Sequence, residues 1–427
     1  MVVEEKFAPR SDADRLLGQQ ARTAERDEEP RVSHQPIPYH DGVATNPLSP
    51  SGKPSRRAIF AAATLVPAAS VRGSAANSAL NVGLIGAGNR GTYLAQLVAA
   101  HTPARIAAIS ELFDDRIEAA RKKIPGADQA AFHRDYRDLL ASNVDAVIIA
   151  TPVFLHAEHF EAAVRARKHI YIEKPAAASV ADCKRILKAA DSAPRSLHIT
   201  FGFQRRHGQV YRKAKAVLDT GAIGRIRWAN VQFIKGEPAS RRPRTGNTPP
   251  ADETARIRDW GAWRETSGDL IVENNIHLID VMNWFLGAHP LSAHGTGGRT
   301  MLTYGDNRDH VHVTFDYPGD VQGSLLGTIL APGFYRNVSE QFHGPSGVIE
   351  TSENYWKHYR GREDVTAEKS PRNISIDSVA DFVQRIAEAR PENTGARGVE
   401  STLTAILGRM AMDLGRKVTW EEIMRSA

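Results

Sequence analysis

Short apolar runs alternate with longer amphipathic stretches between Leu80 and Phe203. In Ala146–Ala150 every position is apolar, which indicates a strand buried on both faces. Strands of this kind, separated by helical stretches, predict a doubly wound parallel sheet of the Rossmann type, which binds ligands at the carboxyl ends of its strands. The predicted strands are Val82–Ile85, Ile106–Ile109, Ala146–Ala150, His169–Ile172 and Leu197–Phe203, and the predicted helices are Arg90–Ala100, Asp114–Lys123, Asp135–Ala141, Ala157–Arg167 and Val180–Ala190.

The pattern changes after Phe203, where the segments become longer and tight turns such as Tyr317–Asp320 join them. Segments joined in this way are typical of hairpins. We therefore divide the chain into a Rossmann domain, residues 79–203, and an α+β domain with a large, mostly antiparallel sheet, residues 204–427. Its predicted strands are Arg225–Ile234, Ala293–Gly298, His310–Tyr317, Val321–Ile329, Asn337–Gly344 and Gly347–Ser352, and its predicted helices are Gln209–Thr220, Asn275–Leu286, Ile376–Arg390 and Gly398–Lys417.

Residues 1–78 show neither the hydrophobic period of a strand nor that of a helix, and we predict that they form a leader. Met1–Lys53 is polar and rich in charge and proline, a composition typical of disordered segments. The run Ser55-Arg56-Arg57-Ala58-Ile59-Phe60, with the uncharged alanine-rich stretch after it, resembles a twin-arginine export signal. This resemblance implies export to the periplasm by the twin-arginine route. The alternative is a plain flexible tail on a cytoplasmic protein.

The composition is that of an ordinary globular protein, with 41% hydrophobic and 24% charged residues among 427. The net charge of +6 is small for this length. The basic residues form only small clusters, such as Arg241, Arg242 and Arg244, which favours a solvated surface over nucleic-acid binding. A single cysteine, Cys183, excludes an internal disulfide and is predicted to be structural. No apolar run is long enough to span a bilayer, so we expect no membrane insertion.

A glycine motif joins the first predicted strand to the first predicted helix. Gly86, Gly88 and Gly91 have the GxGxxG spacing, which allows a tight turn, close approach of a pyrophosphate and helix–strand packing. The helix N-terminus then presents free N–H groups to phosphates. Glu111 ends the next strand, 20 residues past Gly91, where a carboxylate can bind both ribose hydroxyls and would repel a 2′-phosphate. This pattern predicts NAD rather than NADP; a glycine-rich turn without a ligand is the alternative.

Further motifs follow the glycine loop along the chain. They are Ala150-Thr151-Pro152 with His156, Glu173-Lys174-Pro175, Gly202-Phe203-Gln204-Arg205-Arg206, Trp263-Arg264, and the run from Ser267 to Asp280. Taken in this order, the motifs resemble those of the Gfo/Idh/MocA family of NAD(P)-dependent sugar and cyclitol oxidoreductases, from about Leu80 to the C-terminus. The resemblance implies a catalytic lysine at position 174, followed by a proline peptide that is often cis, a general base at position 277, and a homodimer or homotetramer.

Two side chains are the main candidates for the chemistry. Lys174 follows a buried strand, so its ammonium can reach the crevice, where a cation lowers the cost of forming an alkoxide from a substrate hydroxyl. His277 has a pKa suited to taking the hydroxyl proton near neutral pH. Glu273 and Asp280 are four and three residues from His277, on one side of a helix, where they can orient it; Asp280 can instead dock that helix. A surface lysine before a turn and a histidine satisfied at an interface are the alternatives.

The group Glu273, His277 and Asp280 also has the residue types of a metal site. The family needs no metal, so we expect none here. Many members carry Asp where this chain has Glu273, whose longer arm moves the carboxylate by about one methylene. That departure counts against the familiar cyclitol substrates.

Position and resemblance together predict the remaining contacts. Aromatic side chains such as Trp260 can stack on a sugar face, although core packing explains most of them equally well. Substrate contacts are assigned to Arg206, Trp263, Asn274 and His277. Cofactor contacts are assigned to Gly86, Gly88, Asn89, Arg90, Gly91, Glu111, Thr151, Pro152, His156, Glu173, Lys174 and Arg264.

The leading hypothesis is an NAD-dependent oxidoreductase that moves a hydride between a ring carbon of a sugar, cyclitol or sugar derivative and nicotinamide. Because little free NAD exists outside the cytoplasm, an exported enzyme has to keep its cofactor and regenerate it within the cycle. A redox-neutral NAD-dependent glycoside hydrolase, which works by C3 oxidation, elimination and re-reduction, is therefore the first alternative. A non-catalytic sugar- or nucleotide-binding protein is the second, and the presence of both Lys174 and His277 argues against it.

Overall fold

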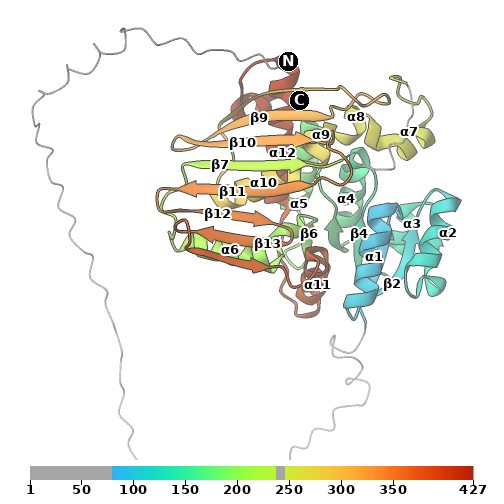
Figure 1. Cartoon of the computed structure of the whole chain (residues 1–427). Helices are drawn as coiled ribbons and strands as arrows, with labels where there is room; N and C mark the ends of the chain where they lie inside the picture. Colours follow the sequence, from blue (N-terminus) through green and yellow to red (C-terminus); the bar gives the residue numbers. More distant parts are fainter. Residues whose placement is uncertain (1–78, 237–245, 427) are drawn as a thin grey trace, which may run out of the picture. The chain divides into compact units, whose positions relative to one another are not determined.

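The computed structural model describes residues 79–236 and 246–426 (Figure 1). The predicted leader, with its paired arginines, lies outside the described residues, and so do Arg241, Arg242 and Arg244. The described chain carries two sheets, one parallel and one mostly antiparallel, as the sequence predicts.

Six parallel strands form the first sheet, in the order β3-β2-β1-β4-β5-β6. The order reverses between β1 and β4, so this is the doubly wound arrangement, with its crevice at the carboxyl ends of those two strands. Strand β3 has only three residues, too few to give an apolar run, and the sequence did not reveal it. The strands are β1 Asn81–Ile85, β2 Arg105–Ser110, β3 Ala131–His133, β4 Ala146–Ile149, β5 His169–Ile172 and β6 Ile199–Phe201, and the helices are α1 Asn89–His101, α2 Asp114–Lys123, α3 Tyr136–Ala141, α4 His156–Arg165 and α5 Val180–Asp191.

Nine strands form the second sheet, in the order β14-β13-β12-β11-β7-β10-β9-β8-β15. Only β7 and β10 pair in parallel among these strands; the other pairs are antiparallel, many of them hairpins. The strands are β7 Trp228–Ile234, β8 Ser292–Gly298, β9 His310–Tyr317, β10 Val321–Thr328, β11 Asn337–Gly344, β12 Gly347–Ser352, β13 Tyr355–Tyr359, β14 Val365–Lys369 and β15 Val418–Thr419.

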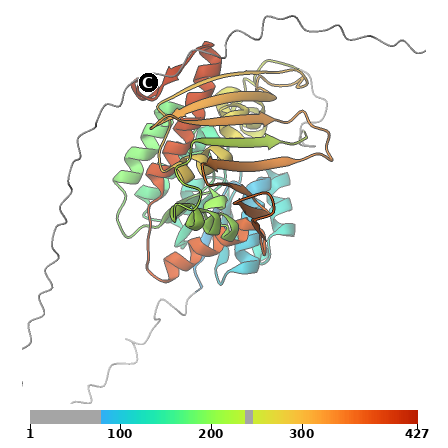
Figure 2. The same ribbon diagram turned by 60° about the vertical axis from the view of Figure 1, so that its left-hand side comes forward.

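Helices cover one face of this second sheet (Figure 2). Buried and exposed residues alternate along β10, because successive side chains point to opposite faces of a strand. Helix α12 packs against β8 and also against α5, so it joins the two sheets. The helices after the first sheet are α6 Gln209–Asp219, α7 Glu253–Asp259, α8 Arg264–Ser267, α9 Asp269–Glu273, α10 Ile276–Leu286, α11 Ile374–Ala387, α12 Gly395–Leu414 and α13 Trp420–Arg425.

Helix α11 lies against the Rossmann sheet, although it comes late in the chain. It packs on α1, and its Val379, Phe382 and Val383 share a core with Val82 and Leu94 (Figure 1). The sequence placed this helix in the second domain because pattern alone does not show which surface a helix covers. The domain division at residue 203 stays a prediction.

Candidate active site

The carboxyl ends of the parallel strands bring the predicted motifs together. The glycine loop follows β1, Glu111 follows β2, Thr151 follows β4 and Lys174 follows β5. Helix α10, which carries His277, approaches this edge from the second domain: its neighbour Glu273 bonds to Lys174. The edge is where ligands bind in doubly wound sheets.

The glycine loop is shaped to cradle phosphates. Gly86 has a φ of +91°, in the left-handed region that favours glycine. A Cβ on Gly91 would lie 2.0 Å from the carbonyl oxygen of Gly86, so only glycine fits there. Helix α1 begins at Asn89, and Gly88 before it offers no side-chain cap. The first N–H groups of α1 are thus available to a phosphate, which is how the residues present fit NAD.

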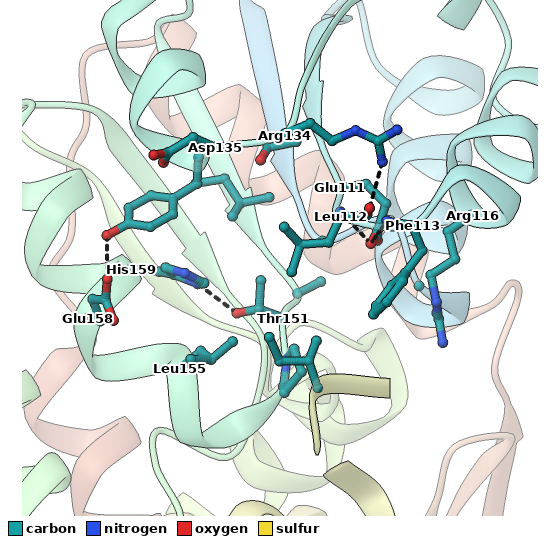
Figure 3. Close-up of a pocket in the computed structure, with 18 of the residues that line it drawn as sticks. Glu111, Leu112, Phe113, Arg116, Arg134, Asp135, Thr151, Leu155, Glu158 and His159 are labelled. Carbon is teal, nitrogen blue, oxygen red and sulfur yellow. Dashed lines mark hydrogen bonds between the residues drawn. The ribbon is translucent and has the colours of Figure 1, made fainter. Parts of the chain in front are cut away.

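Glu111 ties the end of β2 to the glycine loop. Its carboxylate accepts hydrogen bonds from the backbone N–H of Ala87 (2.9 Å), Leu112 (2.7 Å) and Phe113 (3.1 Å). The side chain lines a cavity of about 440 Å³ that also reaches Gly86, Gly88, Thr151 and Pro152. Phe113 and Arg116 lie on one side of this cavity and Leu155 and His159 on the other (Figure 3). This cavity lies where a doubly wound sheet binds the adenosine half of a dinucleotide.

His156 holds two active-site loops rather than facing the crevice. Its ring is buried, with Nδ1 2.8 Å from the carbonyl oxygen of Pro175 and Nε2 3.0 Å from that of Thr151. Burial lowers the pKa of His156. The imidazole therefore fixes the loop after β4 relative to the segment after Lys174, and its predicted contact with the cofactor stays a prediction.

Lys174, at the end of β5, is held in place by contacts with the second domain. The Lys174–Pro175 peptide bond is cis, as the resemblance implies. The ammonium donates to the carbonyl oxygen of Glu273 (2.6 Å) and to its Oε1 (3.2 Å). Just beyond, the N–H of Ala176 donates to Thr402 Oγ1 in α12 (2.9 Å). These contacts direct the ammonium toward the helix that carries the candidate base.

Glu173 and Arg90 form an ion pair behind the lysine. Arg90 Nε is 2.9 Å from Glu173 Oε1, so the first turn of α1 is joined to the end of β5. One nitrogen of the Arg90 guanidinium, Nη2, is buried without a hydrogen-bond partner in the structure. The cofactor contact predicted for Arg90 stays a prediction.

His277 lies in a strongly positive environment. Burial of the imidazole, followed by the charges of Lys174, Arg205 and Arg90, lowers its pKa well below the usual range. Its Nδ1 is buried and has no hydrogen-bond partner in the structure. The ring is therefore neutral at physiological pH and keeps a nitrogen lone pair for a proton.

Asp280 forms its contacts away from His277. Arg206 donates to both carboxylate oxygens of Asp280 at 2.8 to 3.0 Å, and Ser401 Oγ donates to Oδ1 at 2.8 Å. These bonds join α10 to the turn Gln204–Arg206 and to α12. Of the two roles expected for Asp280, the contacts favour docking of the helix, and Arg206 is engaged in that same pair.

The other predicted site residues have neighbours mainly in the second domain. Arg264 donates to the carbonyl oxygen of Asp306 (2.8 Å). Trp263 is 2% exposed and meets Tyr304 edge-on. Asn274 donates to the carboxylate of Glu273. Roles for Arg264, Trp263 and Asn274 toward cofactor or substrate stay predictions.

A buried ion-pair network beside the site was not found from the sequence. Arg205 pairs with Glu340 (2.8 Å) and Glu353 (3.2 Å), and Thr351 also donates to Glu340 (2.7 Å). The positive charge of Arg205 is one of those that lower the pKa of His277. The sequence feature that could have revealed this network is Glu340, a glutamate at a buried position of β11.

The described ranges contain neither a metal-binding cluster nor a membrane-spanning helix. Within residues 79–236 and 246–426, no group of three or more His, Cys, Asp or Glu residues is arranged to hold a metal ion. No helix in those ranges is long and apolar enough to cross a membrane. Cys183 is fully buried, and burial raises the pKa of its thiol, an environment typical of a structural cysteine.

Two family models match the chain in succession. Residues 80–201 match the oxidoreductase family with an NAD-binding Rossmann fold, and residues 211–350 match the GFO/IDH/MocA C-terminal domain. The fold and site thus define an NAD-binding oxidoreductase. The chain belongs to the Gfo/Idh/MocA family, which confirms the resemblance found in the motifs and the choice of NAD.

Curated relatives and solved structures agree with this assignment. The inositol 2-dehydrogenase of Salmonella paratyphi B is 27% identical over 326 residues, covering 73% of this chain and 82% of that protein. The inositol 2-dehydrogenase of Rhizobium meliloti is 29% identical over 270 residues, covering 62% and 74%. A levoglucosan dehydrogenase in complex with NADH and levoglucosan shares the fold, with a TM-score of 0.68 and 21% identity over 80% of this chain and 99% of that one.

A myo-inositol 2-dehydrogenase from Lactobacillus plantarum has the same fold, with a TM-score of 0.64 and 21% identity. This match also covers 80% of this chain and 99% of that one. The predicted leader, residues 1–78, lies outside the residues that the two family models match.

Proposed function

We propose that this protein oxidises a ring hydroxyl of a sugar or cyclitol and that NAD is the hydride acceptor. The observation that carries the proposal is the convergence of Lys174 and the neutral His277, from two domains, at the carboxyl edge of the parallel sheet. The relatives named as inositol and levoglucosan dehydrogenases support this substrate class.

The side chains divide the work as follows. His277 accepts the proton of the substrate hydroxyl, because its lowered pKa keeps it neutral. The Lys174 ammonium stabilises negative charge that develops on the same oxygen. Glu273 holds that ammonium through its carbonyl and carboxylate oxygens. NAD, when bound, supplies the acceptor for the hydride.

Removal of the lysine tests the assignment. Lys174→Ala should lower turnover by about 10²–10⁴-fold, the range for one positioned acid–base or electrostatic group, and should leave NAD binding intact. Turnover is followed by NADH absorbance and by product analysis of candidate sugars, inositols and glycosides. Lys188→Ala, an exposed lysine on α5, is the matched control. A Lys174→Ala variant that keeps its activity would contradict the catalytic role of Lys174.

The same assay separates the competing activities. A dehydrogenase accumulates NADH in step with oxidised product. A redox-neutral glycoside hydrolase releases its aglycone from a glycoside with no net NADH. A protein that binds a sugar and turns over none of these substrates is the binding protein of the second alternative.

We propose in addition that the chain is exported by the twin-arginine route. The support is the run Ser55 to Phe60 with its paired arginines and the alanine-rich stretch after it. Arg56→Lys with Arg57→Lys should retain the protein in the cytoplasm, as measured by fractionation. Periplasmic protein in the double variant would contradict this route.

A homodimer or homotetramer is likewise proposed. The support is the sheet face opposite the helices, where β7 and β10 present alternate residues that include Trp228 and Leu326, both exposed in one chain. Exposed apolar side chains on a broad sheet are typical of an interface. Light scattering on the purified protein should give a multiple of the chain mass of 46.8 kDa, or of its leader-free form, and a monomer would contradict the proposal.

A further inference from the structure

The second domain supplies part of the wall of the cofactor cavity. The Rossmann side of the cavity includes Gly86, Glu111 and Thr151. The other side includes Glu253 and Ile257 of α7 and Trp260 of the short turn Trp260–Ala262. Because Glu111 marks the ribose position, these second-domain residues face the adenosine half of the dinucleotide and lie away from the reacting edge at Lys174.

One arginine fastens this segment to the Rossmann domain. Both terminal nitrogens of Arg258 bond to the carboxylate of Asp115 in α2, at 2.9 and 3.0 Å. The Arg258 guanidinium also lies 3.9 Å from the centre of the Phe113 ring. A bidentate pair and a cation–π contact share one side chain here, although both partners of the ion pair are largely exposed.

Further contacts position the segment on either side of Arg258. Arg256 pairs with Glu265 (2.9 Å) and lies 5.5 Å from the ring of Phe154, in the loop after β4. At the end of α7, the Tyr304 hydroxyl donates to Asp259. Helix α7 has only seven residues and none of them is buried, so it gains little stability from its own packing. Its position over the cavity depends on these side-chain contacts.

We propose that α7 and the turn Trp260–Ala262 form a cover over the adenosine half of NAD, and that Arg258 is the latch that holds it closed. Ile257 and Trp260 give the cavity an apolar wall, and the bond from Arg258 to Asp115 has to break before the nucleotide leaves. The cover therefore slows NAD release. It takes no part in proton or hydride transfer, which occurs at the other end of the dinucleotide.

The test measures NAD dissociation directly, so it does not depend on which sugar is the substrate. Protein loaded with NADH is mixed with an excess of NAD, which does not fluoresce, and the release of NADH is followed by the change in its fluorescence. Arg258→Ala should raise the dissociation rate about three- to tenfold, in line with loss of one exposed bidentate pair and one cation–π contact. The matched control is Arg360→Ala, which removes another exposed arginine–carboxylate pair, with Asp364, in the β13–β14 hairpin.

Two further measurements make the outcome decisive. Asp115→Asn should speed release as well, and the double variant with Arg258→Ala should add little, because both changes remove the same bond. Release from the unchanged protein should accelerate with salt, and release from Arg258→Ala should depend on salt much less. Equal release rates for Arg258→Ala, Asp115→Asn and the Arg360→Ala control would overturn the proposal, whatever the fate of the proposed sugar oxidation.

Discussion

At the scale of single residues, burial and then charge decide the protonation state of the candidate base. An exposed histidine titrates close to pH 6.5, but His277 is enclosed and faces cations. Among the charges, Lys174 has the largest effect on the pKa of His277, and Arg205 and Arg90 add to it. Protonating His277 would add a further positive charge to this group, so the neutral ring is favoured. The ammonium that stabilises the substrate oxygen thereby also keeps its partner ready to accept a proton.

This environment predicts the pH dependence of the reaction. Because the neutral form of His277 is the active one, activity should fall as the pH drops through its pKa. That pKa is lowered, so the acid limb of kcat/KM should be centred below 6.5, with a level region above it. The profile is measured at saturating NAD between about pH 5 and 8, the window in which histidines titrate. An acid limb centred above 6.5 would be inconsistent with a base in this environment.

At the scale of elements, one buried ion pair sets the position of the catalytic helix. Asp280 of α10 is 1% exposed in its side chain and bonds to Arg206, whose side chain is 15% exposed, and to Ser401 of α12. These bonds join three segments that are far apart in the sequence. The helix that carries His277 is thus held against the turn after β6, on the same side as Lys174.

Loss of that carboxylate should loosen the helix. Asp280→Asn leaves the Arg206 cation enclosed without its partner, so the free energy of unfolding should fall by about 3–5 kcal/mol. Urea denaturation of the NAD-loaded protein measures this, with Asp364→Asn, at an exposed pair, as the control that should behave like the unchanged protein. If Asp280 instead oriented the base directly, the variant would keep its stability and lose kcat alone.

At the scale of the whole molecule, residues from both predicted domains line the cavity that matches the adenosine half of the cofactor. The Rossmann domain provides the phosphate cradle and Glu111, and the second domain provides His277 and a wall of the adenosine cavity. Helix α12, packed on both sheets, keeps these parts in register. An arrangement of this kind favours a nucleotide that stays bound between turnovers.

Retention predicts what the purified protein contains. Protein prepared without added nucleotide should release close to one NAD per chain on denaturation, measured by enzymatic assay of the supernatant. Such a result would direct the substrate screen toward reactions that regenerate the cofactor within the cycle. Empty protein that binds NAD weakly would contradict retention, and NADP in place of NAD would show that Glu111 does not exclude a 2′-phosphate.

The sequence predicted the fold well where the signal is local. Helix α2 and strands β9, β11 and β12 have the bounds expected from pattern, since their alternation or amphipathic period ends at clear turns. Short elements without a period of their own, such as β3, α7 and β14, gave no signal. Their conformation depends on the neighbours they pair with or lie against.

For the site, the sequence by itself determined the candidates for the chemistry: the glycine loop and Glu111 follow from spacing and residue type, and Lys174 and His277 follow from residue type and position together with the family resemblance. Tertiary structure alone decided the partners. It joined Asp280 to Arg206, placed α11 on the Rossmann sheet and brought α7 over the adenosine cavity. The physical reason is that period and spacing act over a few residues, whereas ion pairs and burial join segments that only the folded chain brings together.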